Sequence, residues 1–453
     1  YTFVDRGRHH YLSQLLEEGK ANLDLEAIAK AKAEVTPEDV CCIIYTSGTT
    51  GQPKGVMHRH RNIVSQVMAA YDIPSDQCHR ALSFLPMCHA YEKMLLYLYQ
   101  YRGISIYYAE NMGTIVDNIK EVDPNIMTCV PRLLEKIFDK LYASGKKLPY
   151  AQKVIYYWAL NLALKYQIEG RSAAYNAKLK LADKLIYKKW REAIGGTWDI
   201  VISGGSAIRP EIASFFSAIG MPVFEGYGLT ETSPVISVHN REPKGRKIGT
   251  VGRPLAGIEV KVNPETSELL CRGHNIMKGY YKAPELTAEA IDADGWFHTG
   301  DTAKIDENGH VIITGRIKSI FKTSMGKYIN PFLIEEKMAQ SPFIDNIMVV
   351  GENQKFAAAI ISPNAQYLKS WAQIHKIEFK NIEDLIKNSE VIARFRKEVN
   401  KYNVELGDYE KIKKFDIVPE EWSQKNGLLT PTLKVKRNKA MEFYKENIDK
   451  LFA

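Results

Sequence analysis

Apolar and polar residues alternate along the chain in blocks that predict strands separated by helices. Short runs rich in β-branched and apolar residues predict strands at 40–45, 81–85, 104–108, 126–130, 199–202 and 223–225. Helical patterns lie between them, for example at 57–70 and 113–121. Strands that alternate with helices are typical of a mostly parallel α/β sheet.

The pattern changes after these strands. Residues 132–193 predict one long helical stretch, and after residue 245 short strands at 258–262, 268–272 and 311–314 predict a small antiparallel unit. From Ile317 onward, helices at 331–340 and 383–405 and strands at 346–351 and 356–362 indicate a separate α+β domain.

We therefore predict an α/β fold with two domains. Residues 1–316 form a large domain of mostly parallel sheets with helices and a small antiparallel β unit. Residues 317–453 form a small α+β C-terminal domain.

Composition favours a globular protein of the cytoplasm. Of the 453 residues, 45% are hydrophobic and 25% are charged, which is ordinary for a globular domain. No apolar run approaches the ~20 residues that a membrane-spanning helix needs. The six cysteines show no Cys-x-x-Cys spacing, so we expect free thiols in a reducing compartment.

The net charge of +8 is concentrated in residues 139–192, where twelve Lys/Arg face four Asp/Glu. Aromatic residues recur there at roughly helical spacing. We interpret this stretch as a solvated helical face packed through its aromatics, with peripheral membrane contact as the alternative. No motif supports binding to nucleic acid.

Residues 45–55, Tyr-Thr-Ser-Gly-Thr-Thr-Gly-Gln-Pro-Lys-Gly, follow the first predicted strand. Glycines let backbone N–H groups approach an anion, and hydroxyls and an ammonium add donors. The segment suits a polyphosphate, although it lacks the Gly-Lys-Ser/Thr of the common P-loop. The candidate phosphate-binding residues are Thr46, Ser47, Gly48, Thr49, Thr50, Gly51 and Lys54.

This segment resembles the phosphate-binding signature of the AMP-forming adenylating enzymes, which include acyl-CoA synthetases, luciferases and peptide-synthetase adenylation domains. Four further segments resemble the same superfamily, in the expected order: Gly226–Thr232, Gly295–Asp301, Gly315–Lys318 and Pro431–Arg437. In that superfamily a sizeable part of the large domain precedes the phosphate loop, so we expect the large domain to lack its N-terminal part here.

The resemblance implies roles at an ATP site. Tyr227 and Gly228 lie at adenine, where Tyr227 stacks on the ring, and Gly204, Gly205 and Ser206 line the same pocket. Thr230 contacts the α-phosphate, and Glu231, with Thr46, holds Mg²⁺, for which carboxylate oxygen is a suitable ligand. Asp301 binds the ribose hydroxyls and Arg316 assists it.

The resemblance also implies a catalytic lysine and a hinge. Lys434 would bridge the carboxylate and the α-phosphate during adenylation. Several family members have Gly where Leu433 stands, and the nearby Lys436 is the competing candidate. Lys318 would be the hinge about which the C-terminal domain swings between two half-reactions.

Residues 85–93 and the long helical stretch resemble the long-chain fatty acid–CoA ligase branch, and His89 would lie near the junction of the acyl and pantetheine channels. Our leading hypothesis is an ATP-dependent long-chain fatty acid–CoA ligase with ATP, fatty acid and CoA as substrates and Mg²⁺ as cofactor. The alternatives are a fatty acyl-AMP ligase that passes the acyl group to a carrier-protein thiol, and a non-catalytic nucleotide- or acyl-binding relative.

Overall fold

The computed structural model describes residues 12–47, 53–111, 113–430 and 433–453. Its largest sheet has seven strands in the order β4-β3-β5-β6-β7-β8-β9. Neighbours from β4 to β7 are parallel, and β8 and β9 are added antiparallel. The bounds are β3 Arg80–Ser83, β4 Ser105–Tyr108, β5 Ile126–Cys129, β6 Ile200–Ser203, β7 Val223–Gly228, β8 Val235–Val238 and β9 Arg253–Pro254.

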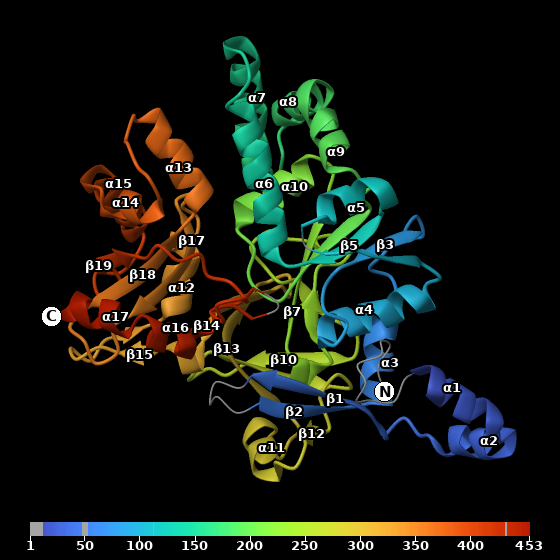
Figure 1. Ribbon diagram of the computed structural model, residues 1–453. Helices are drawn as coiled ribbons and strands as arrows, with labels where there is room; N and C mark the ends of the chain where they lie inside the picture. The colour runs from blue at the N-terminus through green and yellow to red at the C-terminus, as the bar shows by residue number, and fades with distance from the viewer. Residues whose placement is uncertain (1–11, 48–52, 112, 431–432) are drawn as a thin grey trace.

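Helices cover both faces of this sheet (Figure 1). Successive residues of a strand point to opposite faces, so Ile126 of β5 joins a cluster with α3 and α4, whereas Met127 joins the cluster of α6, α7 and α10. This double burial explains why β5 and β6 are mostly apolar and buried at every position. The bounds are α3 His60–Ala69, α4 Ala90–Tyr101, α5 Ile115–Val122, α6 Pro131–Gly145, α7 Tyr150–Leu164, α8 Ala173–Ala182, a π-helical turn Asp183–Tyr187, α9 Lys188–Ile194 and α10 Pro210–Ala218.

Three aromatic residues within residues 139–192 face inward. Tyr156, Tyr187 and Trp190 are buried in the core cluster of α6, α7 and α10. Tyr156 and Trp190 make an edge-on ring contact at 5.0 Å between centroids. The interpretation that these helices pack through their aromatics is confirmed for these three residues.

The first predicted strand belongs to a different sheet from the one expected. β1 (Val40–Ser47) pairs antiparallel with β2 (Pro53–Arg59), which pairs with β12 (Gly279–Tyr280). The prediction of a helix from residue 57 is therefore wrong at its start, because residues 57–59 belong to β2. Val56 and His58 are buried, and Met57 between them is more exposed, as in a strand. This alternation is short, and the longer helical pattern that follows it dominated the prediction.

The predicted small antiparallel unit is present as a four-stranded sheet in the order β10-β11-β13-β14. The third of its strands was not predicted from the sequence, because its Gly and Asp residues are unfavourable in strands. The bounds are β10 Ile258–Val262, β11 Glu268–Gly273, β13 Phe297–Ile305 and β14 Val311–Arg316, with α11 at Pro284–Ala290.

The C-terminal residues build their own apolar clusters around a three-stranded sheet, β17-β18-β19. The predicted helix 383–405 is divided into two, because the Asn388 side chain accepts hydrogen bonds from the Glu390 and Val391 N–H groups and caps the second helix. The bounds are β15 Phe321–Lys322, β16 Tyr328–Ile329, α12 Pro331–Met338, β17 Ile344–Val350, β18 Ala357–Pro363, α13 Ala365–Ile374, α14 Ile382–Lys387, α15 Ser389–Asn403, β19 Ile412–Ile417, α16 Arg437–Phe443 and α17 Lys445–Phe452.

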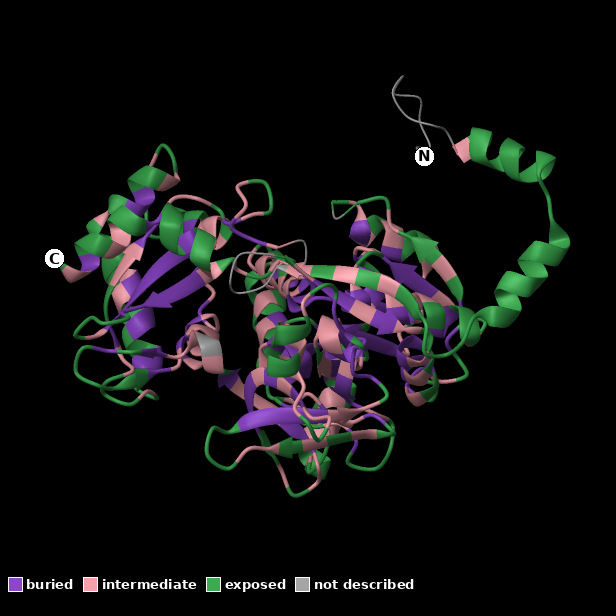
Figure 2. Ribbon diagram, turned by 90° about the horizontal axis from the view of Figure 1, so that it is seen from below, coloured by how far each residue is buried: buried purple, intermediate pink, exposed green. Residues whose placement is uncertain are grey.

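The fold is α/β, with a large N-terminal domain and a small C-terminal domain beside it (Figure 1). Figure 2 shows buried strands at the centre of each domain, whereas α1 (Leu12–Ala21) and α2 (Leu25–Glu34) extend away and bury no residue. Within the described residues, no helix is long and apolar enough to cross a membrane. All six cysteines are free, as expected.

Candidate active site

The predicted phosphate-binding segment joins β1 to β2, which pair antiparallel. Thr46 and Ser47 end β1, Lys54 lies at the start of β2, and Thr46 pairs with Lys54. The predicted residues Gly48, Thr49, Thr50 and Gly51 lie outside the described residues. The Lys54 ammonium lies 5.0 Å from the centre of the Tyr280 ring, a cation–π distance.

Glu231 lies in a short 3₁₀ helix, Thr230–Thr232, directly after β7. The Tyr280 hydroxyl donates to Glu231 Oε1 at 2.9 Å, so the ring beneath Lys54 also orients this carboxylate. Glu231 remains partly exposed. Lys54, Tyr280 and Glu231 thus form a connected row from β2 through β12 to the turn after β7.

The backbone carbonyl group of Thr230 is hydrogen-bonded to a buried histidine. His58 Nε2 lies 2.6 Å from the Thr230 carbonyl oxygen, and its N–H donates to that oxygen. Burial lowers the pKa of His58, while the carbonyl contact opposes that shift. The imidazole therefore acts as a neutral clamp on the backbone of the turn. His58 and Tyr280 carry no signal in the sequence, because each meets its partner across a long sequence separation.

Asp301 is a buried carboxylate with two side-chain donors. Arg316 Nε donates to Oδ1 at 2.7 Å, and the Tyr227 hydroxyl donates to Oδ2 at 2.6 Å. Asp301 and Arg316 are direct partners in the β13–β14 register. Burial, with Asp301 adding to it, raises the pKa of Tyr227 well above its usual range, so Tyr227 stays a neutral donor.

The segment after β6 lies beside the turn after β7, because Ser203 pairs with Glu225 in the parallel sheet. In such sheets ligands bind beyond the carboxyl ends of the strands, where the strand order changes. Gly204 is needed here, since a Cβ at that position would lie 3.1 Å from the Tyr91 ring. Gly205 has φ +85, and Ser206 is exposed next to it.

Lys434 reaches this part of the large domain from the C-terminal domain. Its ammonium lies in the electrostatic field of Arg316 and Asp301. Its side chain keeps solvent access, yet protein atoms surround it on several sides. This desolvation lowers the pKa of Lys434, Arg316 lowers it further, and Asp301 opposes both. Lys434 and the competing candidate, Lys436, are both exposed, and Lys436 directly precedes α16.

His89 lies near Lys434 and also has a structural task. Its Nδ1 accepts a hydrogen bond from the Tyr91 N–H at 3.3 Å and caps the start of α4. Burial lowers the pKa of His89, and the positive charge of Lys434 lowers it further. The imidazole is therefore neutral, and its position is fixed by the helix that it caps.

One face of α6 contacts the C-terminal domain. Arg132 forms an ion pair with Asp345, and Asp139 accepts a hydrogen bond from Asn364 at 3.4 Å. The rings of Tyr142 and Tyr367 lie 6.3 Å apart. We call these three pairs the α6 contact. Closer to the domain boundary, the Asn330 amide donates to the Thr314 carbonyl oxygen at 3.0 Å.

The structure describes the backbone of Lys318, the predicted hinge residue, in the 3₁₀ turn Ile317–Ser319, but not its side chain.

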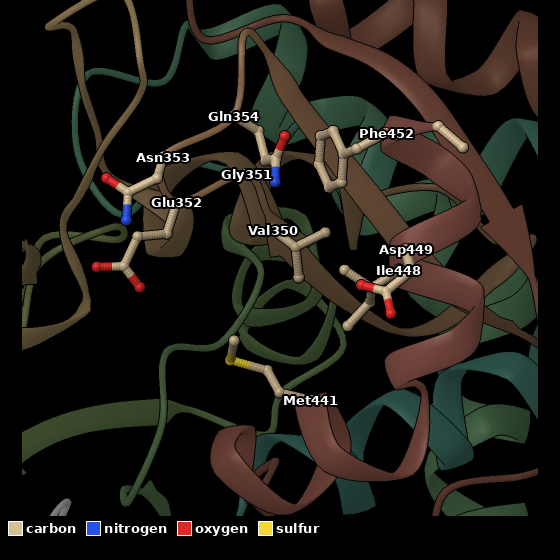
Figure 3. A pocket seen from close by; sticks show the side chains of 10 residues that line it. Val350, Gly351, Glu352, Asn353, Gln354, Met441, Ile448, Asp449 and Phe452 are labelled. Carbon is tan, nitrogen blue, oxygen red and sulfur yellow. The ribbon is translucent and has the colours of Figure 1, made fainter.

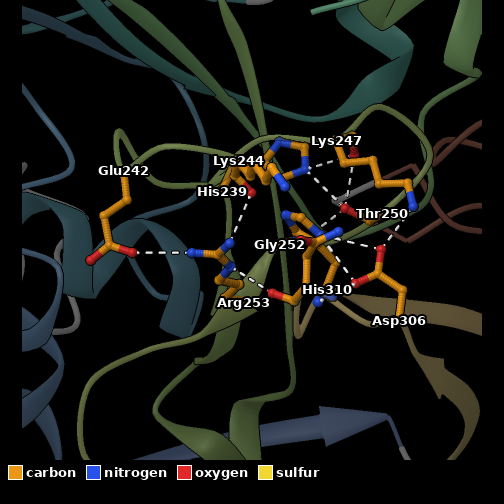
Figure 4. Close-up of polar contacts among 10 residues, drawn as sticks. His239, Glu242, Lys244, Lys247, Thr250, Gly252, Arg253, Asp306 and His310 are labelled. Carbon is orange, nitrogen blue, oxygen red and sulfur yellow. Dashed lines mark hydrogen bonds and ion pairs between the residues drawn. The ribbon is translucent and has the colours of Figure 1, made fainter. Parts of the chain in front are cut away.

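The segment that leads from β8 to β14 is fixed by a polar network (Figure 4). His239 Nδ1 accepts from the Glu225 N–H at 3.1 Å, and Nε2 donates toward the Lys247 carbonyl oxygen at 3.1 Å. Lys247 in turn pairs with Asp306 at 2.8 Å. This network ties the end of β7 to the four-stranded sheet that carries Asp301.

A cavity of about 440 Å³ lies in the C-terminal domain, between the end of β17 and α16–α17 (Figure 3). Met441, Ile448 and Phe452 give it an apolar side, and Glu352 and Asp449 add carboxylates. None of the predicted site residues lines it.

Comparisons with known proteins agree with this arrangement. A family model described as AMP-binding enzyme matches residues 3–281, and one described as AMP-binding enzyme C-terminal domain matches residues 318–453. Long-chain-fatty-acid–CoA ligase 1 of Cavia porcellus is 32% identical over 98% of this chain. The match spans 67% of that relative.

Solved structures share the fold. The adenylation domain of a carboxylate reductase from Mycobacterium chelonae aligns with a TM-score of 0.69 and 23% identity, over 92% of this chain and 60% of that one. An o-succinylbenzoate-CoA synthetase of Bacillus subtilis, in complex with ATP and magnesium ion, aligns with a TM-score of 0.61 and 18% identity, over 89% of this chain and 70% of that one. With family models matching both domains, the chain belongs to the AMP-binding enzymes.

Proposed function

We propose that this protein is an ATP-dependent ligase that joins long-chain fatty acids to CoA. In the first half-reaction a carboxylate oxygen attacks the α-phosphorus of ATP, a new P–O bond forms, and pyrophosphate leaves. In the second half-reaction the CoA thiolate attacks the acyl carbon, the C–O bond to AMP breaks, and the thiol proton goes to solvent.

The observation that carries the proposal is that the Lys434 ammonium lies within electrostatic range of Asp301 and Arg316. Both reactants of the first half-reaction are anions, so catalysis needs a cation between them more than an acid–base pair. The Lys434 ammonium supplies that charge, and its pKa is lowered by the protein atoms around it. Asp301, within its electrostatic range, is then suited to accept hydrogen bonds from the ribose hydroxyls.

The remaining residues of the large domain hold the nucleotide in this proposal. Tyr227 stacks on adenine, Thr230 contacts the α-phosphate, and Lys54 steadies the departing pyrophosphate. Glu231 is partly exposed and is oriented by Tyr280, so its oxygen atoms fit a Mg²⁺ ion, with Thr46 as the second protein ligand. When bound, Mg²⁺ would neutralise phosphate charge.

The second half-reaction requires Lys434 to leave. A rotation at Lys318 would break the α6 contact and bring the segment Thr323–Gly326 toward the site. Residues 1–316 and 317–453 are the two bodies of this motion in our proposal. The part of the site that belongs to the large domain would then serve both half-reactions.

The identity of the substrates rests on the named relative and on the position of His89. The relative is named a long-chain-fatty-acid–CoA ligase. His89 lies near Lys434, where the acyl and pantetheine channels would meet. Its neutral imidazole leaves the single positive charge of Lys434 facing the fatty acid carboxylate.

Pyrophosphate release with a panel of fatty acids, measured with and without CoA, tests the proposal. We expect CoA-dependent acyl-CoA formation that is strongest with long chains. Adenylate formation without CoA transfer would instead favour an acyl-AMP ligase that uses a carrier-protein thiol. Nucleotide binding without pyrophosphate release would favour a non-catalytic relative.

Peripheral membrane contact through helices 139–192 is a second, separate proposal. Its support is the excess of lysine there together with the exposed side chains of Tyr150, Val154 and Ile155 on α7. Sedimentation with anionic vesicles tests it, and Ile155→Glu should reduce the bound fraction. Equal sedimentation of both proteins would contradict it.

A further inference from the structure

Two adjacent cysteines lie on the strand that leads into the candidate nucleotide site. Cys41 and Cys42 are both in β1, where successive side chains ordinarily point to opposite faces. A β-bulge changes this locally, because Val40 pairs with Arg59 and Cys42 pairs with His58, which leaves Cys41 as the extra residue. The two sulfur atoms consequently lie 3.9 Å apart.

Both thiols also contact one buried residue. Cys41 Sγ lies 3.3 Å from the His58 carbonyl oxygen, and Cys42 Sγ lies 3.7 Å from His58 Nδ1. The other ring nitrogen, Nε2, donates to the Thr230 carbonyl oxygen at 2.6 Å. The row from Cys42 through His58 to Thr230 therefore connects the dithiol to the turn that also carries Glu231.

The pair is reactive and accessible. Cys41 is exposed and Cys42 is partly exposed. The hydrogen bond between the sulfur atoms is the largest cause that lowers the pKa of Cys41 to about 6, and the same bond raises the pKa of Cys42. The pair thus presents one thiolate beside one thiol, and the thiolate is the nucleophile.

The geometry favours a bridging atom over a disulfide. Cα atoms of consecutive residues are about 3.8 Å apart. Disulfides usually join Cα atoms about 4.4–6.8 Å apart, and shorter spans store strain. A direct bond would also require the two sulfur atoms to approach to about 2.05 Å. One thiophilic atom placed between them needs a much smaller movement.

We propose that Cys41 and Cys42 form a dithiol site for a trivalent thiophilic ligand, of which an organic arsenical is the probe, and that its occupation displaces His58 from Thr230. With phenylarsine oxide the reaction balances as follows. Two As–S bonds form, the As–O bond breaks, and the oxygen leaves as water with one proton from the remaining thiol and one from solvent. No electron transfer takes place.

The binding test is independent of enzymatic activity. The protein is titrated with phenylarsine oxide and the adduct is measured by intact-mass spectrometry. We expect one arsenical per chain, released by 2,3-dimercaptopropanol but retained in an equal thiol concentration of 2-mercaptoethanol. Cys41→Ser or Cys42→Ser should weaken binding by at least about 100-fold, because each removes the second, intramolecular bond. Cys88→Ser, at an exposed single cysteine, is the matched control and should change nothing.

Peptide mapping of the wild-type protein covers the case in which a serine variant folds poorly. After arsenical treatment, both Cys41 and Cys42 should resist alkylation while Cys88 is alkylated. No adduct, an adduct lost with Cys88→Ser, or binding by Cys41→Ser or Cys42→Ser within about threefold of wild type would overturn the site.

The coupling to Thr230 rests on the proposed function and has its own measurement. ATP–pyrophosphate exchange by the wild-type protein should fall at least about tenfold when the arsenical is bound, and should recover with the dithiol. Exchange that persists at full occupancy would overturn the coupling. An absence of exchange before treatment would count against the proposed function, while the mass measurement would still decide the site.

Discussion

The two sides of the candidate site are built differently. On the large-domain side, each functional group has a partner within the same domain: Asp301 is held by Tyr227 and Arg316, Glu231 by Tyr280, and Thr230 by His58. On the C-terminal side, Lys434 sits on a short turn, in which the Thr430 N–H donates to the Lys434 carbonyl oxygen at 2.8 Å. The α6 contact joins the C-terminal domain, which carries that turn, to the large domain.

This difference separates two kinds of residue. If the C-terminal domain moves as we propose, a preorganised group on the large-domain side should serve both half-reactions, because it stays in place. A group brought by the C-terminal domain should serve the first half-reaction alone. Each prediction below tests whether a residue belongs to the side to which we assign it.

The largest effect should follow Lys434→Ala. We expect acyl-adenylate formation to fall about 10²–10³-fold, the usual scale for the loss of one preorganised electrostatic contact. Thioester formation from preformed acyl-AMP should be spared, because Lys434 has left by then. ATP–pyrophosphate exchange and the reaction of acyl-AMP with CoA measure the two halves separately.

Lys436→Ala is the matched control for that prediction, with a change of less than about threefold. A large effect at Lys436 and none at Lys434 would show that the catalytic lysine is misplaced by two residues. Equal loss of both half-reactions in Lys434→Ala would indicate general damage to the fold.

Asp301→Asn should weaken nucleotide binding in both half-reactions. The change removes the charge that Arg316 and Tyr227 hold in place, and hydrogen bonds to charged groups contribute about 1.5–3 kcal/mol, which corresponds to roughly 10–100-fold in Kd. AMP affinity measured by calorimetry is the test. Loss confined to the first half-reaction would place Asp301 with the residues of the C-terminal side.

Tyr227→Phe provides the control for Asp301, since it removes the hydroxyl and keeps the ring. The affinity for AMP should fall by about tenfold or less, because one of the two donors to Asp301 is lost.

Acyl-adenylate formation should decline at alkaline pH. Lys434 must be protonated to act, and burial lowers its pKa below the ordinary 10.5. The charge is present below that lowered pKa and is lost as pH rises through it, by about tenfold per pH unit above it. A pH profile of ATP–pyrophosphate exchange measures this alkaline decline. The decline should be missing from the residual activity of Lys434→Ala. An unchanged decline in the variant would assign it to another group.

Disruption of the α6 contact should have a smaller and one-sided effect. Arg132→Asp should slow adenylation about fivefold, because a partly exposed ion pair contributes about 1 kcal/mol, and thioester formation should not slow. The double variant Arg132→Asp/Asp345→Arg restores opposite charges and should recover most of the loss. Failure of the exchanged pair to recover would mean that Arg132 acts through its other partners.

On the large-domain side, the sequence predicted the strands that end at the site better than the strands that pack beside them. The strand ends that carry Ser203 and Gly226 were predicted because buried parallel strands give long apolar runs. β2 and β13 were not predicted from the sequence, because β2 adjoins a helical pattern and β13 carries Gly300 and Asp301. Each strand pairs with a neighbouring strand and with a more distant one, which is β12 for β2 and β11 for β13, and local propensity does not report such pairing.

The same limit applies to the partners of the functional groups. Motif resemblance identified Asp301, Glu231 and Lys434, but His58 and Tyr280 entered only through contacts in the folded chain. The α6 contact could not be predicted either, since it joins α6 to residues about two hundred positions later. Contacts such as those of His58, Tyr280 and α6 depend on how distant elements pack together. They could not be predicted because the pattern of a single sequence describes one element at a time.

The smallest effect should come from Leu433→Gly. Leu433 has φ 61, a left-handed conformation that costs a non-glycine residue about 1–2 kcal/mol. Its side chain also packs against the buried cluster of Val350, Ile360 and Trp422, and glycine would lose that partial burial. The two contributions have opposite sign and similar size, so the free energy of unfolding should change by less than about 1 kcal/mol, as thermal denaturation would show. Adenylation should stay within about threefold, because the backbone of the turn, more than the Leu433 side chain, aims Lys434. A tenfold loss of adenylation at unchanged stability would show that the leucine itself positions the lysine.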